Sequence, residues 1–133
     1  MSSNMNKNDT GKPLAFVIED DEDLATIFAK AVEAAEYDVE IIYMGDVAMQ
    51  RLQETVPNIV VLDLNLPYVS GATILENIRA DERMSSTRII LATANYALAQ
   101  SIEDRADLVL VKPITFSQLR DLTSRLRRRI VEQ

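Results

Sequence analysis

The sequence predicts an α/β fold, a doubly wound five-stranded parallel sheet of order 2-1-3-4-5 covered by five helices. Short apolar runs alternate along the chain with longer segments of helical period. Most runs are continuously apolar, as expected of strands that are buried on both faces. Strands that alternate with helices form a parallel sheet through right-handed crossovers. The expected strands lie near residues 14–18, 39–43, 58–62, 87–92 and 107–111.

Three of the intervening segments show a clear apolar stripe with the period of a helix. The first stripe comprises Leu24, Ile27, Phe28, Ala31 and Ala35. The third helix is expected to carry Ile74, Leu75 and Ile78. The last helix is expected to carry Phe116, Leu119, Leu122, Leu126 and Ile130. Thr115, followed three residues later by Gln118, forms a capping box that predicts where this last helix begins.

Composition limits the class of protein. The 133 residues suit a single domain, which we assign to residues 13–133 after a disordered polar tail at residues 1–12. A net charge of −7 argues against nucleic-acid binding by this domain. The absence of cysteine and of any long apolar stretch predicts a cytoplasmic protein without a membrane span. The absence of histidine excludes Ser-His-Asp triads and histidine-based zinc sites on this chain.

Charged residues stand at the ends of several expected strands. Glu19 and Asp20 follow the first strand, Asp63 follows the apolar run of the third, and Lys112 follows the fifth. The switch point of the 2-1-3-4-5 order lies between strands one and three, where ligands bind at the carboxyl ends. Clustered carboxylates with oxygen-only donors favour a hard ion such as Mg²⁺. The pattern therefore predicts a metal-assisted site that accepts a phosphoryl group.

Each of these residues, and Thr93 directly after the fourth expected strand, also has an ordinary structural interpretation. Asp63 is compatible with a helix N-cap or a turn, Thr93 with a buried hydroxyl bonded to backbone, and Lys112 with an exposed lysine before a turn. The acids at residues 21–23 are best explained as helix-capping residues. The functional interpretation is preferred because these residues occur together, in order, at strand ends.

These residues lie in stretches that resemble the receiver domain of bacterial two-component response regulators across residues 14–130. The stretches are Val-Ile-Glu-Asp-Asp at 17–21, Val-Val-Leu-Asp-Leu-Asn-Leu-Pro at 60–67, Ser-Gly at 70–71, Leu-Ala-Thr-Ala at 91–94 and Val-Lys-Pro at 111–113. The resemblance implies a signalling domain rather than a conventional enzyme, one that promotes its own phosphoryl transfer and dephosphorylation. It also implies the flavodoxin-like topology of receivers.

The resemblance assigns roles residue by residue. Asp63 would accept the phosphoryl group from a phosphohistidine of a sensor histidine kinase or a histidine phosphotransfer protein. Asp20 would bind Mg²⁺ directly, Glu19 mostly through water, and Asn65 through its backbone carbonyl. Thr93 and Lys112 would contact the phosphoryl oxygens, and the Lys112–Pro113 peptide bond would be cis. The output partner is unknown, and a homodimer is one alternative.

Two departures from the family pattern affect the surface that reports phosphorylation. Val109 stands where the family usually has an aromatic residue. The separation of 19 residues between Thr93 and Lys112 is about three residues shorter than usual, close to one helical turn. The fourth helix is therefore expected to be short, near residues 96–103, and to respond to phosphorylation by order–disorder.

Three alternatives remain at this stage. A haloacid-dehalogenase-type phosphatase also uses an aspartyl phosphate, but it requires Asp-x-Asp on the first strand. An FMN carrier of the same fold needs a phosphate-binding loop where this chain places acids. A receiver-like interaction module without phosphorylation is the third alternative.

The basic end of the last helix is interpreted as a solvated surface or as a contact with a partner or second copy. It comprises Arg125, Arg127, Arg128 and Arg129.

Overall fold

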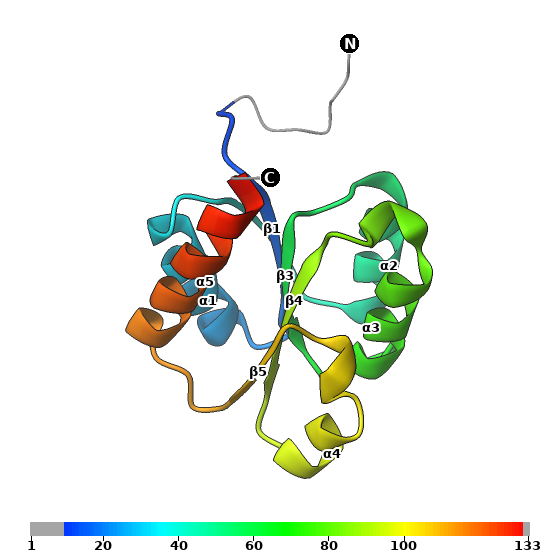
Figure 1. The fold of residues 1–133 in the computed structure, drawn as a ribbon. Helices are drawn as coiled ribbons and strands as arrows, with labels where there is room; N and C mark the ends of the chain where they lie inside the picture. The colour runs from blue at the N-terminus through cyan, green and yellow to red at the C-terminus, as the bar shows by residue number, and fades with distance from the viewer. Residues whose placement is uncertain (1–9, 132–133) are drawn as a thin grey trace.

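The computed structural model describes residues 10–131, which form a five-stranded parallel sheet (Figure 1). The strands lie side by side in the order β2-β1-β3-β4-β5, as the sequence predicts. All four pairings are parallel. Their bounds are β1 (Leu14–Ile18), β2 (Asp38–Ile42), β3 (Ile59–Asp63), β4 (Arg88–Thr93) and β5 (Leu108–Val111).

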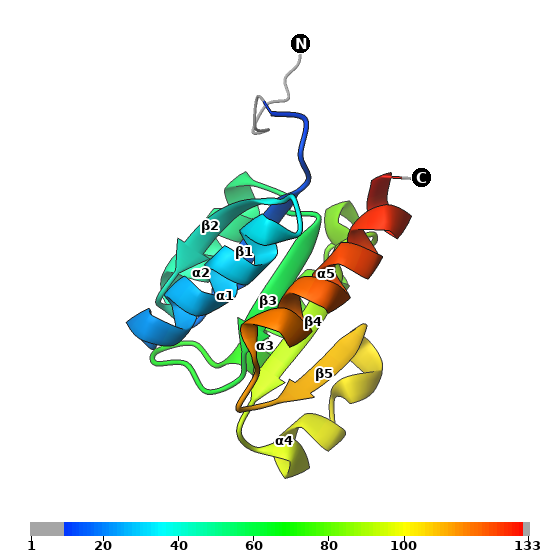
Figure 2. The same ribbon diagram turned by 90° about the vertical axis from the view of Figure 1, so that its left-hand side faces the viewer.

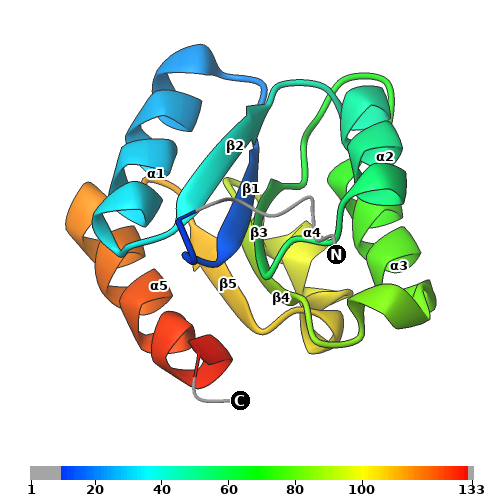
Figure 3. The same cartoon turned by 90° about the horizontal axis from the view of Figure 1, so that it is seen from above.

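Helices cover both faces of the sheet, α1 and α5 on one face and α2 and α3 on the other (Figure 3). The helices are α1 (Glu22–Ala34), α2 (Gly45–Glu54), α3 (Gly71–Ala80), α4 (Tyr96–Gln100) and α5 (Phe116–Val131). Two 3₁₀ turns, η2 (Glu82–Met84) and η3 (Glu103–Arg105), precede β4 and β5. The predicted cap of α5 is present, since the Thr115 hydroxyl accepts a hydrogen bond from the Gln118 N–H at 3.0 Å.

The tail predicted to be disordered, residues 1–12, lies mostly outside the described residues. Within the described part, the Thr10 hydroxyl donates a hydrogen bond of 2.6 Å to the Asp38 carboxylate at the start of β2. Within residues 10–131, no helix is long and apolar enough to cross a membrane.

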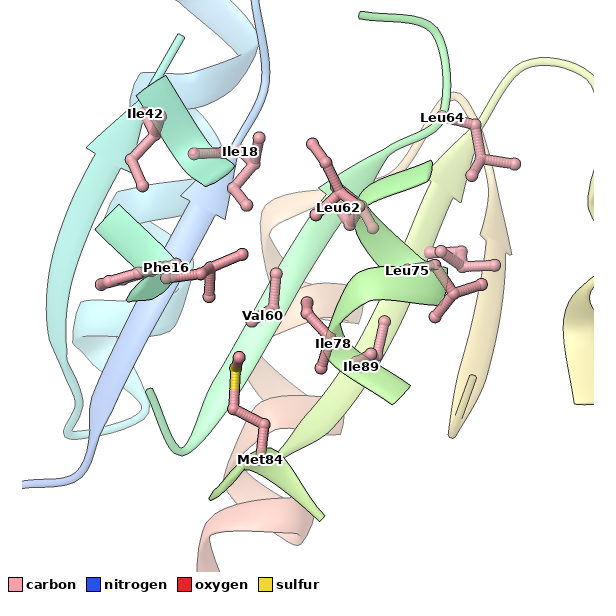
Figure 4. Close-up of a cluster of buried hydrophobic side chains, with 14 of the residues drawn as sticks. Phe16, Ile18, Ile42, Val60, Leu62, Leu64, Leu75, Ile78, Met84 and Ile89 are labelled. Carbon is pink, nitrogen blue, oxygen red and sulfur yellow. The ribbon is translucent and has the colours of Figure 1, made fainter. Parts of the chain in front are cut away.

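The hydrophobic core has two layers because side chains of the central strands alternate between the two faces of the sheet. Phe16 and Ile18 of β1 face α2 and α3, and together with Val60 and Leu62 of β3 they form the cluster shown in Figure 4. Ala15 and Val17 belong to the other layer, beneath α1 and α5. These central residues are almost completely buried, as their continuously apolar runs predict.

The buried face of α1 is rotated from the predicted stripe. Ile27 is 42% exposed, whereas Ala25 and Ala29 are buried beside Phe28. The small residues Ala25 and Ala29, rather than Ile27, are therefore buried on this part of α1. Phe116, predicted in the stripe of α5, is 38% exposed, and the guanidinium of Arg120 lies 5.8 Å from its ring centroid.

The fourth helix is short, as the spacing predicts, with five residues in α4 followed by η3. Asn95 caps it, because its side-chain oxygen accepts a hydrogen bond from the Leu98 N–H at 3.1 Å. Ala99 is buried, and Leu98 is 44% exposed. Val109 is partly buried against the same core layer as α3. The side chain at this position of β5, Val109, is therefore a partly buried aliphatic group in place of the aromatic ring usual in the family.

A buried tyrosine links the end of α1 to α5. Tyr37 is 1% exposed, and its hydroxyl donates a hydrogen bond of 2.8 Å to the Thr123 carbonyl. Burial raises the pKa of this hydroxyl above its ordinary value.

We expect Tyr37→Phe to lower the free energy of unfolding by about 1 kcal/mol, measured by urea denaturation. Tyr68→Phe is the matched control because Tyr68 is 81% exposed, and its stability should equal that of the wild type.

Candidate functional site

The predicted site residues meet at the carboxyl edge of the sheet, where β1 and β3 end as neighbours. Ile18 pairs in register with Leu62, so Glu19 and Asp63 follow side by side. One carboxylate oxygen from each of Glu19, Asp20 and Asp63 lies within 4.8 Å of the other two. The structure therefore brings together the three acids that the sequence places at the ends of two strands, β1 and β3.

Lys112 joins this cluster from the end of β5. Its Nζ donates a hydrogen bond of 2.8 Å to Glu19 Oε1 and lies 3.6 Å from Asp63 Oδ1. Burial lowers the pKa of Lys112, but the hydrogen bond to Glu19 and the charges of Asp63 and Glu19 outweigh burial and leave the pKa raised. Lys112 is therefore a partly buried cation within the cluster and not an exposed lysine before a turn.

Asp63 is a buried carboxyl group with an unusual proton affinity. It is 4% exposed, and burial raises its pKa to about 6. The Asn65 N–H, which donates a hydrogen bond of 3.2 Å to Asp63 Oδ1, lowers the pKa, whereas the charge of Glu19 raises it further. The ammonium of Lys112 offsets only part of this increase. Asp63 is therefore ionised near neutral pH at a cost in free energy that a further cation would relieve.

Glu19 and Asp20 differ in their surroundings although they are adjacent in sequence. Glu19 is 1% exposed, and its second carboxylate oxygen accepts a hydrogen bond of 3.2 Å from the Asp21 N–H. Asp21 in turn caps α1 by accepting a hydrogen bond from the Leu24 N–H, as predicted. Asp20 is exposed and has no hydrogen-bond or ion-pair partner within residues 10–131. Its carboxylate is therefore the acid of the cluster that is most available to a ligand.

Thr93 ends β4, and its hydroxyl contacts the loop that follows. The Asn95 N–H donates a hydrogen bond of 2.9 Å to Thr93 Oγ1, and the hydroxyl lies 3.4 Å from the Asn95 carbonyl oxygen. The Lys112 N–H also donates to the Thr93 carbonyl at 2.8 Å. Thr93 therefore makes the backbone hydrogen bonds expected of a buried structural threonine. It also lies at the edge of the sheet where the acids meet.

The sequence reasoning missed two supporting residues. Asn95 both binds the Thr93 hydroxyl and caps α4, so it connects the site to that helix. Gly71 lies directly against β3, where any Cβ would overlap the Asp63 carbonyl oxygen and the Leu64 Cα. The Ser-Gly pair at residues 70–71 was a usable signal, because Ser70 also caps α3 by accepting from the Thr73 N–H. Asn95 also carried a local signal, because Asn is a preferred N-cap residue and it directly precedes the residue at which the fourth helix was expected to begin.

The donor set fits Mg²⁺. Three carboxylates supply oxygen ligands without nitrogen or sulfur, which is the set that hard divalent cations prefer. The exposed side of Asp20 leaves room for the waters that Mg²⁺ usually retains. The Lys112–Pro113 peptide bond is cis, as the resemblance implies.

Comparison with known proteins gives the class to which this fold and site belong. The family model of the response regulator receiver domain matches residues 15–124, and the chain belongs to that family. The chain is 33% identical over 110 residues to the phosphate regulon transcriptional regulatory protein PhoB of Rhizobium meliloti. This alignment covers 80% of the chain and 48% of PhoB.

Two further proteins extend the comparison. The DNA-binding response regulator MtrA of Mycobacterium tuberculosis is 27% identical over 122 residues, covering 92% of this chain and 52% of MtrA. The chain thus spans about half the length of PhoB and MtrA. The crystal structure of response regulator TrrA from Thermotoga maritima in complex with Mg²⁺ and BeF has the same fold, with a TM-score of 0.76 and 22% identity. That match covers 86% of this chain and 98% of TrrA.

The raised pKa of Asp63 predicts a pH-dependent stability. The folded protein holds this proton more tightly than the unfolded chain does, so stability decreases as pH rises from about 4 through about 6 and stays lower above it. We expect Asp63→Asn to raise the free energy of unfolding by about 1–3 kcal/mol near pH 7.5 in the presence of a chelator. The gain should shrink toward pH 5, as measured by urea denaturation across pH.

Asp23→Asn provides the control for this measurement, since it removes an exposed carboxylate of α1 that lies outside the cluster. It should show no comparable gain. A stabilisation by Asp63→Asn that is equal at both pH values would contradict the assignment of the effect to ionised Asp63.

Proposed function

We propose that this receiver domain accepts a phosphoryl group on Asp63 and holds Mg²⁺ through Glu19, Asp20, Asp63 and the backbone carbonyl of Asn65. The observation that carries the proposal is that the Asp63 carboxylate lies within 4.8 Å of a carboxylate oxygen of the exposed acid Asp20 and 3.6 Å from the ammonium of Lys112. Phosphoryl transfer depends on positioning and charge neutralisation more than on covalent machinery. A nucleophile flanked by a cation and a metal-binding acid pair meets that requirement.

The proposed donor is a phosphohistidine of a sensor histidine kinase or a histidine phosphotransfer protein. Because the chain has no histidine of its own, the partner must supply this group. An Asp63 carboxylate oxygen attacks the phosphorus atom, the bond from phosphorus to the donor nitrogen breaks, and the imidazole leaves with the bonding electron pair. The product is an acyl phosphate, and hydrolysis of its bond to phosphorus returns Asp63 to the carboxylate. Bound Mg²⁺ would supply positive charge to the phosphoryl oxygens.

Lys112 and Thr93 act on the phosphoryl group after transfer. The Lys112 ammonium, already 3.6 Å from Asp63 Oδ1, neutralises one phosphoryl oxygen. The Thr93 hydroxyl donates to another and gives up its contacts with Asn95. Because Asn95 caps the five-residue α4, this exchange alters the segment at residues 94–106 by order–disorder.

Small-molecule phosphorylation tests the acceptor. Incubation with acetyl phosphate and Mg²⁺ should add the mass of one phosphoryl group to the wild-type protein, detected by intact mass spectrometry. Asp63→Asn should remain unlabelled because the attacking carboxylate is absent. Asp46→Asn, an exposed acid in the first turn of α2, should label like the wild type. Equal labelling of Asp63→Asn and wild type would place the acceptor elsewhere.

A metal titration tests the ligands separately from phosphorylation. We expect Mg²⁺ to raise the melting temperature by mass action, since a ligand that binds only the folded state stabilises by about 2.7 kcal/mol at a hundred times its Kd. Asp20→Asn should abolish this response and relieve like-charge repulsion in the absence of metal. Asp23→Asn should keep the wild-type response. An unchanged Mg²⁺ titration of Asp20→Asn would remove Asp20 from the ligand set.

A further inference from the structure

A cavity lies between α2, α3 and the 3₁₀ turn η2, on the other side of the sheet from α5. In Figure 2, α1 and α5 cover the face of the sheet toward the viewer, and α2 and α3 cover the opposite face. The cavity has a volume of about 480 Å³ and is lined by residues of all three elements. Pockets that bind small molecules usually measure about 300–1,000 Å³, so this cavity is large enough to hold one.

The buried side chains that line the cavity are apolar. Leu52 of α2 and Ile78 of α3 belong to the hydrophobic core, and both are almost completely buried. Two methionines line it as well, the partly buried Met49 from α2 and the buried Met84 from η2, which Figure 4 shows near Ile78. Thioether side chains are flexible and polarizable, and their sulfur atoms make favourable contacts with aromatic rings. This part of the lining therefore favours a flat aromatic group.

One wall of the cavity is held in place by Arg83. Its guanidinium donates hydrogen bonds to the carbonyl oxygens of Leu52 at 3.0 Å and Gln53 at 3.2 Å, near the end of α2. It also donates to the Asp81 carboxylate at 2.7 Å. These bonds connect η2 to α2, so the cavity is already formed without a ligand. Because Arg83 and Asp81 form an ion pair, the two residues together add no net charge to the lining.

Two polar groups of the lining keep unused bonding capacity. Glu82 is exposed, and its carboxylate has no hydrogen-bond or ion-pair partner within residues 10–131. Asn77 is also exposed, and its amide nitrogen donates to the Met49 sulfur, a weak acceptor, at 3.0 Å. The side-chain oxygen of Asn77 accepts no hydrogen bond from the described residues. The lining thus carries one net negative charge and one available amide oxygen, and both attract a cationic donor.

We propose that this cavity binds a small molecule with one aromatic ring and one ammonium group. The ring lies against the thioethers of Met49 and Met84 and against Ile78. The ammonium group pairs with the Glu82 carboxylate and donates a hydrogen bond to the Asn77 side-chain oxygen. The charge disfavours an analogue with a carboxylate in place of the ammonium group, because Glu82 would repel a second anion.

The cavity is separate from the phosphorylation site. η2 precedes the first residue of β4, Arg88, whereas Thr93 ends that strand at the edge where the acids meet. The strand between them is about 17 Å long. No hydrogen bond or ion pair of the described residues joins a cavity residue to Asp63 or Thr93. Ligand binding therefore does not require phosphorylation, and its failure is distinguishable from a failure of phosphoryl transfer.

The test uses tryptamine, which has an indole ring and an ammonium group, in a nuclear magnetic resonance titration of the ¹⁵N-labelled protein. Indole-3-propionate keeps the ring and the two-carbon linker but carries a carboxylate, and butylamine is an amine without a ring. We expect tryptamine to shift the amides of Asn77, Ala80 and Met84 with a dissociation constant on the order of 1 mM, as suits so small a molecule. The two comparison compounds should bind about fivefold more weakly or less.

Variants test the charge and the space in the cavity. Glu82→Gln should weaken tryptamine binding about threefold. Glu103→Gln is the matched control, since Glu103 is also exposed and begins the other 3₁₀ turn, η3, but lies outside the cavity. It changes the net charge equally and should bind like the wild type, as should Asp63→Asn. Ala80→Trp fills an exposed position of the lining and should weaken binding about tenfold. Ala80→Leu repeats this block if Ala80→Trp fails to fold.

The proposal is overturned if tryptamine does not shift the cavity amides, or if indole-3-propionate or butylamine binds as tightly. It is also overturned if Glu103→Gln weakens binding as much as Glu82→Gln, or if the block at Ala80 leaves binding unchanged. Shifts confined to the amides around Asp20 and Asp63 would overturn it as well, because they would show that the ammonium group binds the acidic cluster instead.

Discussion

The contact of Lys112 with Glu19 and Asp63 is the interaction on which the site depends. Two buried carboxylates, Glu19 and Asp63, stand at neighbouring strand ends and repel each other. The ammonium of Lys112 lies 2.8 Å from the first and 3.6 Å from the second, and its positive charge offsets part of this repulsion. Because β1, β3 and β5 supply these three groups, the site forms only when the whole sheet is assembled.

The remaining elements keep this arrangement in place. Gly71 lets α3 begin against the Asp63 carbonyl, and Gly45 lets α2 begin against the backbone of Val69. A side chain at either glycine would overlap the loop after β3. The elements that support the acids are therefore fixed by close backbone contacts as well as by the hydrophobic core.

The sheet and the acid cluster were predictable because both depend on local signals. Continuously apolar runs identify β1 and β3, and the charged residue that ends each run gives the carboxyl edge. The short α4 followed from the spacing between Thr93 and Lys112 when it is compared with the family pattern. Ile27 was misplaced because the helical stripe favoured this large apolar side chain over Ala25 and Ala29, which are the buried residues. The cap formed by Asn95 could have been predicted from the expected start of the fourth helix, whereas its hydrogen bond to the Thr93 hydroxyl depends on the path of the loop between them.

Long-range pairing was also beyond the sequence. Asp107 contacts Arg79, 28 residues away, and Arg88, 19 residues away, and no local pattern links these positions. The same limit applies to the contact between β5 and α5. Leu122 and Leu126 were predicted as core positions of α5, but the position of Leu108 beside them follows only from the fold.

The separation of charge along the sheet has a consequence for how the molecule approaches others. Acids gather at the edge that holds Glu19, Asp20 and Asp63, while three arginines without an acidic partner among residues 10–131 gather near the C-terminal end of α5. These are Arg125, Arg128 and Arg129. Such a molecule has a permanent dipole moment, and the field of a charged surface exerts a torque on it. Near a cationic surface the domain would turn its acidic edge forward before contact, whereas an anionic surface would turn it the other way. Salt would weaken this orientation beyond a Debye length of about 8–10 Å.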